Sequence, residues 1–202
     1  MLGVFLDTET NGLNAFTHKI LEIAYKIVDL ETGTLKKEYH ATISQPMDAW
    51  EKSDAESLQI NRFTFTELQQ GVTTELVAQT IIDDFVALGI VRKKAVFICQ
   101  NPSFDRAFFS QLITPETQER LQWPYHWLDL ASMYWALAIK EASRDPNHLP
   151  WITGFSKDLI AAHYHLKPEA KPHRAMNGVD HLLLCYTAVV GFPKKDSPKS
   201  LS

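Results

Sequence analysis

The stretch GVFLDTETNGL, residues 3–13, begins as an apolar run and then carries two acids, Asp7 and Glu9, that stand one residue apart. The apolar run predicts a short buried strand, and the Asn-Gly pair after it predicts a turn. Side chains two residues apart in a strand share a face, so the two carboxylates project together and repel each other. A divalent cation such as Mg²⁺ or Mn²⁺ would remove this repulsion, because hard oxygen ligands suit these ions. Taken alone, two acids at a solvated strand end are the simpler interpretation.

Beyond this stretch, strand-like and helix-like patterns follow one another. Residues 19–30 and 35–44 are apolar and partly alternating, and the ETGT turn between them predicts a hairpin. Further strands are expected at 94–100 and near 127–130. Helical segments are expected at 53–60, 63–71, 73–88, 103–112, 114–121, 130–142, 155–166 and 175–191. This order predicts an α/β fold with a mixed sheet, in a single domain over residues 1–192 with a flexible tail over 193–202.

Charge and cysteine content limit the function classes. The chain has 202 residues, a net charge of -4 and a pI near 6.0, whereas a protein that grips duplex DNA through its phosphates is usually basic. Any contact with nucleic acid is therefore expected to be local or carried by bound cations. The two cysteines, Cys99 and Cys185, form no CxxC or zinc pattern, which predicts reduced thiols in a cytoplasmic protein. No apolar run approaches the length of a membrane span.

Two later segments carry further acids and a histidine. In NPSFDRAFF, residues 101–109, Asp105 falls in the first turn of a predicted helix, where an acid also favours the helix dipole. In KPHRAMNGVDHLLL, residues 171–184, His173 stands near the start of the last helix, with Asp180 seven residues later. Each feature alone has an ordinary interpretation, because first-turn acids and solvated histidines are common.

Four segments in this order resemble the DnaQ-like, or DEDDh, 3′–5′ exonucleases of the ribonuclease H-like superfamily. The matching segments are FLDTETNGL (5–13), NPSFDRAFF (101–109), WLDLASM (127–133) and HRAMNGVD (173–180). The resemblance runs from Leu2 to about Tyr186. It implies an α/β, ribonuclease H-like fold, in which a central mixed five-stranded sheet is flanked by helices.

The resemblance also implies roles for individual residues. The general base would be His173. Two divalent metal ions, Mg²⁺ or Mn²⁺, would be held by four carboxylates, those of Asp7, Glu9, Asp105 and Asp180. The residues expected to bind the terminal nucleotide of the substrate are Thr8, Leu13, Phe16, Asn61 and Phe63. For Leu13 and Phe16, packing within the turn is the alternative. Asp129 in WLDLASM is expected to be structural or to act from behind the carboxylates, because the set of four is complete without it.

One position departs from the family pattern. The family usually places its last acid five residues after the histidine, and that position is Gly178 in this chain. The nearest acid is Asp180, and Asn177 is also close. The last helix either starts earlier, with His173 in its first turn and Asp180 directly below it, or starts near Asn177 as its cap. We expect the second, because Asn-Gly is a poor helix interior and a good junction. Asp180 would then lie in the first turn and face the site.

The sequence therefore predicts a two-metal-dependent 3′–5′ exonuclease that releases 5′-mononucleotides from the 3′ ends of single-stranded DNA or RNA. One alternative is a catalytically weakened nucleic-acid-binding module on the same fold, for which Gly178 is the argument. Another is a metal-dependent phosphatase acting on small nucleotides. Several members of the family are homodimers, so the resemblance also admits a homodimer. The choice between DNA and RNA stays open.

Overall fold

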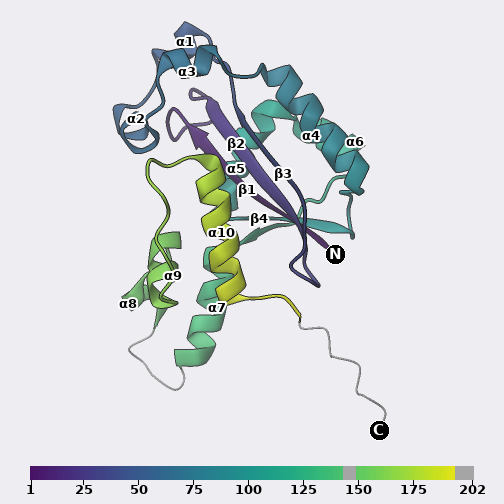
Figure 1. Ribbon diagram of the computed structural model, residues 1–202, viewed down its shortest axis with the longest axis vertical. Helices are drawn as coiled ribbons and strands as arrows, with labels where there is room; N and C mark the ends of the chain where they lie inside the picture. The colour runs from purple at the N-terminus through teal and green to yellow at the C-terminus, as the bar shows by residue number, and fades with distance from the viewer. Residues whose placement is uncertain (143–148, 194–202) are drawn as a thin grey trace.

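The structure, a computed structural model, describes residues 1–142 and 149–193 (Figure 1). Its centre is a five-stranded sheet in the order β3-β2-β1-β4-β5. The strands are β1 (Leu2–Thr10), β2 (Ile20–Asp29), β3 (Leu35–Thr42), β4 (Ala95–Cys99) and β5 (Trp127–Asp129). Of the predicted tail, residues 194–202 lie outside the described residues, and the domain boundaries at 1 and 192 stay a prediction.

The central strand β1 combines both kinds of pairing. It runs antiparallel to β2 and parallel to β4. Strands β2 and β3 form the antiparallel hairpin expected at ETGT, and β5 runs parallel to β4. The sheet is therefore mixed, as predicted. Because β1, β4 and β5 are parallel, their carboxyl ends meet at one edge of the sheet, which is where ligands bind in open α/β sheets.

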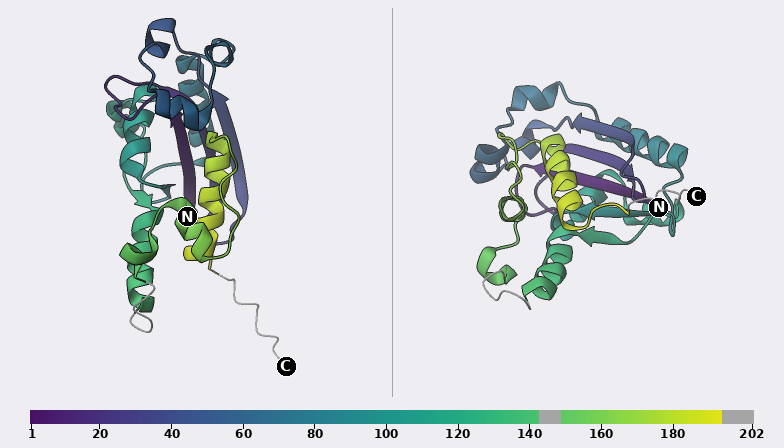
Figure 2. Two further views of the ribbon diagram at one scale, coloured as in Figure 1. Left: turned by 90° about the vertical axis from the view of Figure 1, so that its left-hand side faces the viewer. Right: turned by 60° about the horizontal axis from the view of Figure 1, so that its bottom comes forward.

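Helices cover both faces of the sheet (Figure 2). In the described residues they are α1 (Met47–Trp50), α2 (Ala55–Asn61), α3 (Phe65–Gln69), α4 (Thr74–Leu88), α5 (Pro102–Leu112), α6 (Pro115–Arg120), α7 (Leu130–Ala142), α8 (Pro150–Thr153), α9 (Lys157–His163) and α10 (Ala175–Val189). Threonine and serine side chains cap α4, α6 and α9, as local sequence rules predict. No helix in residues 1–142 or 149–193 has the length and apolar character to span a membrane.

The side chains of β1 alternate between two hydrophobic cores. Val4 and Leu6 pack on one face of the sheet, in a cluster that includes Phe85 of α4 and Phe108 of α5. Phe5 points to the other face, where it packs with residues of α7, α9 and α10. This alternation continues beyond the apolar run, so it decides which helices each polar side chain at the end of β1 meets.

Candidate active site

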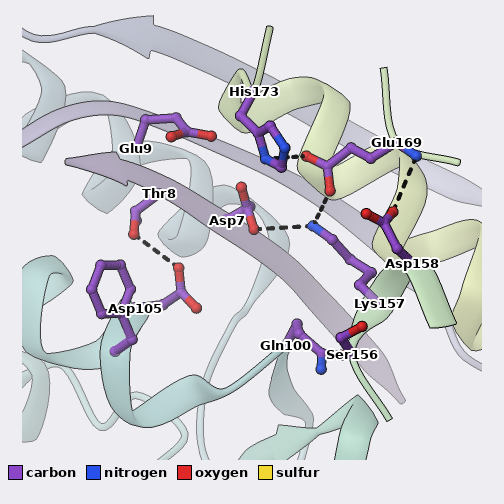
Figure 3. Close-up of a pocket in the computed structure, with 11 residues that line it drawn as sticks. Asp7, Thr8, Glu9, Gln100, Asp105, Ser156, Lys157, Asp158, Glu169 and His173 are labelled. Atoms are coloured by element: carbon purple, nitrogen blue, oxygen red, sulfur yellow. Dashed lines mark hydrogen bonds and ion pairs between the residues drawn. The ribbon is translucent and has the colours of Figure 1, made fainter. Parts of the chain in front are cut away.

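A pocket lies at the carboxyl end of β1, between the start of α5 on one side and α9 and the loop before α10 on the other (Figure 3). It brings together residues that are more than 160 positions apart in the sequence. Its lining residues are Asp7, Thr8, Glu9, Gln100, Phe104, Asp105, Ser156, Lys157, Asp158, Glu169 and His173. Three of the four predicted metal ligands and the predicted general base therefore share one pocket.

The alternation of β1 sorts its polar residues between two sides of the pocket. Asp7 follows Phe5 on the face covered by α10, and Glu9 comes next on that face. Thr8 lies on the opposite face, where its hydroxyl donates a hydrogen bond to Oδ1 of Asp105 at 2.8 Å. Thr8 is buried and its hydroxyl is engaged by an acid, so in this arrangement it positions Asp105.

The three acids are crowded and withdrawn from water. Burial raises the pKa of Asp7 to about 6. Burial, followed by the charge of Asp7, raises the pKa of Glu9 to about 8. Burial and the charge of Asp7 also raise the pKa of Asp105 well above its ordinary value. Carboxylates in this state take up protons unless a cation compensates their charge.

One cation is built into the protein. Lys157, the first residue of α9, places its Nζ 3.6 Å from Oδ1 of Asp7 and 2.9 Å from Oε2 of Glu169. Nζ also donates to the backbone carbonyl of Gly178 at 3.3 Å. Burial opposes the charge on Lys157, but the charges of Asp7 and Glu169 outweigh it and raise the pKa of the ammonium group. Lys157 is therefore a permanent positive charge inside the pocket.

Glu169 connects this lysine to the predicted base. Its Oε1 lies 3.4 Å from Nδ1 of His173, and its Oε2 lies 3.6 Å from Nδ1 of His181 on α10. Burial opposes the charge on Glu169, but the neighbouring His181 and Lys157 lower the pKa of this carboxyl to about 2. The ionised carboxylate therefore fixes the orientation of the His173 ring from behind. His173 itself is one-third exposed and lines the pocket.

Asp180 is the one predicted ligand that the structure does not bring to the pocket. Helix α10 begins at Ala175 with Arg174 as its cap, three residues before the expected cap Asn177, because the buried carboxylate of Glu22 accepts the Ala175 N–H at 2.6 Å. Asn177 is thus inside the helix. The earlier start turns Gly178 toward Asp7. Asp180 lies roughly 200° further around the helix.

On that side of α10, Asp180 forms an ion pair with Lys26 of β2, and its side chain is 53% exposed. The expectation that Asp180 faces the site is corrected accordingly: its carboxylate is engaged elsewhere. Position 178, where the resemblance places an acid, has no side chain, so the predicted set of four carboxylates is not assembled.

The predicted nucleotide contacts fall into two groups. Asn61 is buried, and its amide donates to the Thr10 carbonyl at 2.9 Å while accepting the Phe63 N–H. The Phe63 ring is buried beneath the guanidinium group of Arg174, 3.8 Å from the ring centre. Both residues hold α2 and the following loop onto the sheet, and neither lines the pocket.

Leu13 and Phe16, by contrast, are exposed. Their side chains are 77% and 98% accessible. They line a second hollow that shares Phe104 with the main pocket. They do not pack within the turn, which removes the alternative that the sequence left open, and they offer apolar surface beside the acids.

Sequence reasoning missed Lys157 and Glu169. Neither stands in one of the four matching segments, and no spacing in the sequence links them to Asp7. The only signal was Gly178, because a missing acid implies that the charges of the pocket are balanced differently. Asp129, expected to be structural or to act from behind the carboxylates, has a structural role. Its carboxylate accepts the N–H groups of Asn101, Ala131 and Ser132, which caps the start of α7 and anchors the loop before α5.

The donor chemistry fits one divalent cation better than two. Within residues 1–142 and 149–193, no three His, Cys, Asp or Glu side chains are gathered closely enough to form a metal site as they stand. Instead, Lys157 is ion-paired with Asp7, and the Thr8 hydroxyl donates a hydrogen bond to Asp105. The carboxylates of Asp7, Glu9 and Asp105 nevertheless line one pocket and provide hard oxygen donors. A second ion would need the missing fourth carboxylate.

Comparison with known proteins supports the assignment of the fold. No protein-family model and no curated protein matches the sequence. Among solved structures, E. coli Exonuclease I in complex with a 5cy-dT13 oligonucleotide matches with a TM-score of 0.72 and 16% identity, over 93% of this chain and 40% of that chain. A 3′-exonuclease that recognises the histone mRNA stem-loop matches with a TM-score of 0.68 and 12% identity, over 96% of this chain and 65% of that chain.

Cell-death related nuclease 4 matches with a TM-score of 0.66 and 13% identity, over 95% of this chain and 65% of that chain. The chain thus spans about 40% of the length of Exonuclease I. At these identities the likeness concerns the fold, and it agrees with the order and pairing of the strands. The chain has the ribonuclease H-like fold of the 3′-exonucleases.

Proposed function

We propose that this chain is a divalent-metal-dependent 3′–5′ exonuclease that removes 5′-mononucleotides from the 3′ ends of single-stranded nucleic acid. The observation that carries the proposal is the convergence of Asp7, Glu9, Asp105 and His173 in one pocket at the carboxyl end of β1. Acids that are buried together without a fixed cation for each lower the stability of the folded protein. Their presence is explained if they bind a metal cation that in turn binds a phosphate.

The acids Asp7, Glu9 and Asp105 would hold the metal ion. A divalent ion bound there supplies a Lewis acid that neutralises the scissile phosphate and makes water a better nucleophile near neutral pH. Thr8 keeps Asp105 oriented through its hydrogen bond. The protein thereby contributes a fixed, water-poor arrangement of oxygen donors.

His173 would act as the general base. Its Nδ1 faces the ionised Glu169, which favours a proton on Nδ1 and leaves Nε2 to accept the proton of the attacking water. The water oxygen bonds to phosphorus, and the bond between phosphorus and the 3′ oxygen of the next nucleotide breaks. That oxygen takes a proton from solvent. The products are a nucleoside 5′-monophosphate and a strand shortened by one nucleotide with a free 3′-hydroxyl.

The apolar surface beside the pocket suits an unpaired end. Phe16 and Leu13 provide exposed side chains on which a terminal base can stack, and stacking of this kind is tolerant of sequence. The net charge of -4 argues against a broad phosphate-binding surface. E. coli Exonuclease I forms a complex with a dT13 oligonucleotide and the 3′-exonuclease recognises the histone mRNA stem-loop, so both DNA and RNA belong in the test. A homodimer and a cytoplasmic location stay predictions.

The decisive experiment follows single-stranded DNA and RNA oligonucleotides with a 5′ label in Mn²⁺. We expect a ladder that shortens one nucleotide at a time, no ladder with a 3′-phosphate block, and no activity in EDTA. Asp105→Asn serves as the inactive control. Cutting of circular single strands, or turnover of mononucleotides in preference to oligonucleotides, would contradict the proposal. The second outcome would favour a phosphatase.

One observation favours a second candidate function. Gly178 and the Lys157–Asp7 pair replace part of the predicted carboxylate set, which is the pattern expected of a nucleic-acid-binding module that has lost catalysis. Binding of labelled single strands with no shortening, in either Mg²⁺ or Mn²⁺ and at high enzyme concentration, would establish this alternative.

A further inference from the structure

The space beside Gly178 is filled by an acid from β1. A Cβ atom built on Gly178 would overlap the Asp7 carboxylate, with Oδ1 at 3.0 Å and both Oδ2 and Cγ closer still. The Asp7 side chain therefore occupies the place next to α10 that an acid on the helix would take. Only glycine at position 178 permits this position of Asp7.

A lysine reaches the same place from another element. The Lys157 ammonium lies against the Gly178 carbonyl, the Glu169 carboxylate and the Asp7 carboxylate, and its side chain is only 13% exposed. An ammonium group has three N–H donors. Glu169 and Gly178 accept two of them, and Asp7, at 3.6 Å, is beyond hydrogen-bond distance from the third. Because Lys157 lines the pocket, this third donor is available to a ligand bound there.

The charges of the pocket match one divalent ion. Ionised Asp7, Glu9 and Asp105 carry three negative charges, and Lys157 carries one positive charge. Glu169 is counted apart from these acids because it also pairs with His181, whose Nδ1 lies 3.6 Å from its Oε2. The remaining two negative charges equal the charge of a single divalent cation. A second such ion would have to sit among the acids next to a buried ammonium group.

We propose that this pocket binds one divalent cation and that the Lys157 ammonium takes the place of a second ion. The proposal rests on the exonuclease function proposed above. In it, Lys157 is a catalytic residue: its free N–H donor meets a non-bridging oxygen of the scissile phosphate, and its charge stays in the pocket throughout turnover. Gly178 leaves space in place of the usual fourth acid, and Asp7 and Lys157 together occupy that space.

The test counts bound ions by calorimetric titration of the full chain with Mn²⁺. We expect one ion per chain for the wild type. Lys157→Met, which keeps the length of the side chain and removes its charge, is expected to bind one ion at least about tenfold more tightly because a repelling charge is gone. Lys26→Met is the matched control, since it removes a lysine whose partner, Asp180, lies outside the pocket. It is expected to bind one ion with unchanged affinity.

Two ions bound to the wild type would overturn the proposal, even if Lys157→Met failed to fold. A Lys157→Met protein that folds and binds one ion with unchanged affinity would also overturn it. A different result would contradict the proposed exonuclease function: the wild type would bind no Mn²⁺ and would not shorten oligonucleotides. Turnover with two bound ions would leave the exonuclease function standing and remove only the role of Lys157.

Discussion

The Asp7 carboxylate and the bare backbone of Gly178 occupy adjoining space, and a side chain at residue 178 would overlap the acid. Whether position 178 can accept a side chain therefore depends on the residue at position 7. It provides the sharpest test of the packing around the pocket.

Gly178→Ala is expected to lower the free energy of unfolding by about 1–3 kcal/mol, because the added methyl group forces Asp7 to move. In an Asp7→Ala background the obstacle is absent, and the same change should stabilise α10 by about 1 kcal/mol through helix propensity. Urea unfolding of the four proteins measures both steps. The same sign in both backgrounds would show that Asp7 does not fill this space.

Asp180→Asn is expected to leave nuclease turnover and Mn²⁺ affinity unchanged. Its carboxylate is half exposed and paired with Lys26, so the change should cost at most about 1 kcal/mol of stability. Asp105→Asn, measured beside it, should lose both activity and Mn²⁺ binding. If Asp180→Asn behaves like Asp105→Asn, Asp180 is a metal ligand after all and α10 must shift on binding.

The metal-free protein is expected to become less stable as the pH rises from about 4.5 to about 8. The pKa of Glu9 is raised from 4.5 to about 8 in the folded state. The folded state therefore binds more protons than the unfolded state in this window, and stability falls with rising pH. Above pH 8 the contribution of Glu9 to this destabilisation is complete.

Two comparisons check this pH dependence by thermal melts. Glu9→Gln should reduce the slope by the share of Glu9, because its amide does not titrate, and leave the shares of Asp7 and Asp105 in place. Mn²⁺ should raise the melting temperature more at pH 8 than at pH 5.5, because only the ionised acids attract it. A wild-type stability that rises over the same window would contradict the burial of these carboxylates.

His173→Ala is expected to reduce the turnover rate by roughly 10²–10⁴-fold, the usual contribution of a positioned general base. Mn²⁺ affinity should change little, since His173 faces Glu169 rather than the acids of β1. Single-turnover cleavage and calorimetry give the two values. An unchanged rate near neutral pH would exclude His173 as the base.

Asn61→Ala and Phe16→Ala are expected to act in opposite ways. Asn61 satisfies the Thr10 carbonyl and the Phe63 N–H inside the protein, so its loss should cost about 1–3 kcal/mol of stability with little change in KM. Phe16 is 98% exposed, so its loss should leave stability unchanged and raise KM for oligonucleotides. A raised KM for Asn61→Ala at full stability would restore Asn61 as a substrate contact.

The strands and most helices were predictable because their signals are local. The apolar runs of β1, β2 and β4 and the turn between β2 and β3 appear directly in the sequence. The placement of Asp7, Glu9, Asp105 and His173 in one pocket was also anticipated. It depended on a family resemblance, because no local rule brings residue 7 next to residue 173.

The start of α10 was not predictable from its own residues. Asn177 and Gly178 favour a helix end locally, yet the helix begins earlier because Glu22, a buried acid on β2, accepts the N–H of Ala175. A tertiary contact thus outweighed local propensity. The same shift of the cap by three residues decided that Gly178, and not Asp180, meets Asp7. Lys157 and Glu169 were not predicted for a similar reason, since only the fold brings them close to β1.

The alternation of β1 between two cores has a consequence for the assembly of the sheet. A slip of one residue in the pairing of β1 would move Asp7 and Glu9 to the face lined by Phe85 and Phe108. Two carboxylates would then be buried among aromatic rings, far from Lys157, which is prohibitively unfavourable. The acids that face the pocket therefore also act as register markers, because they leave the central strand only one alignment in which the chain can fold.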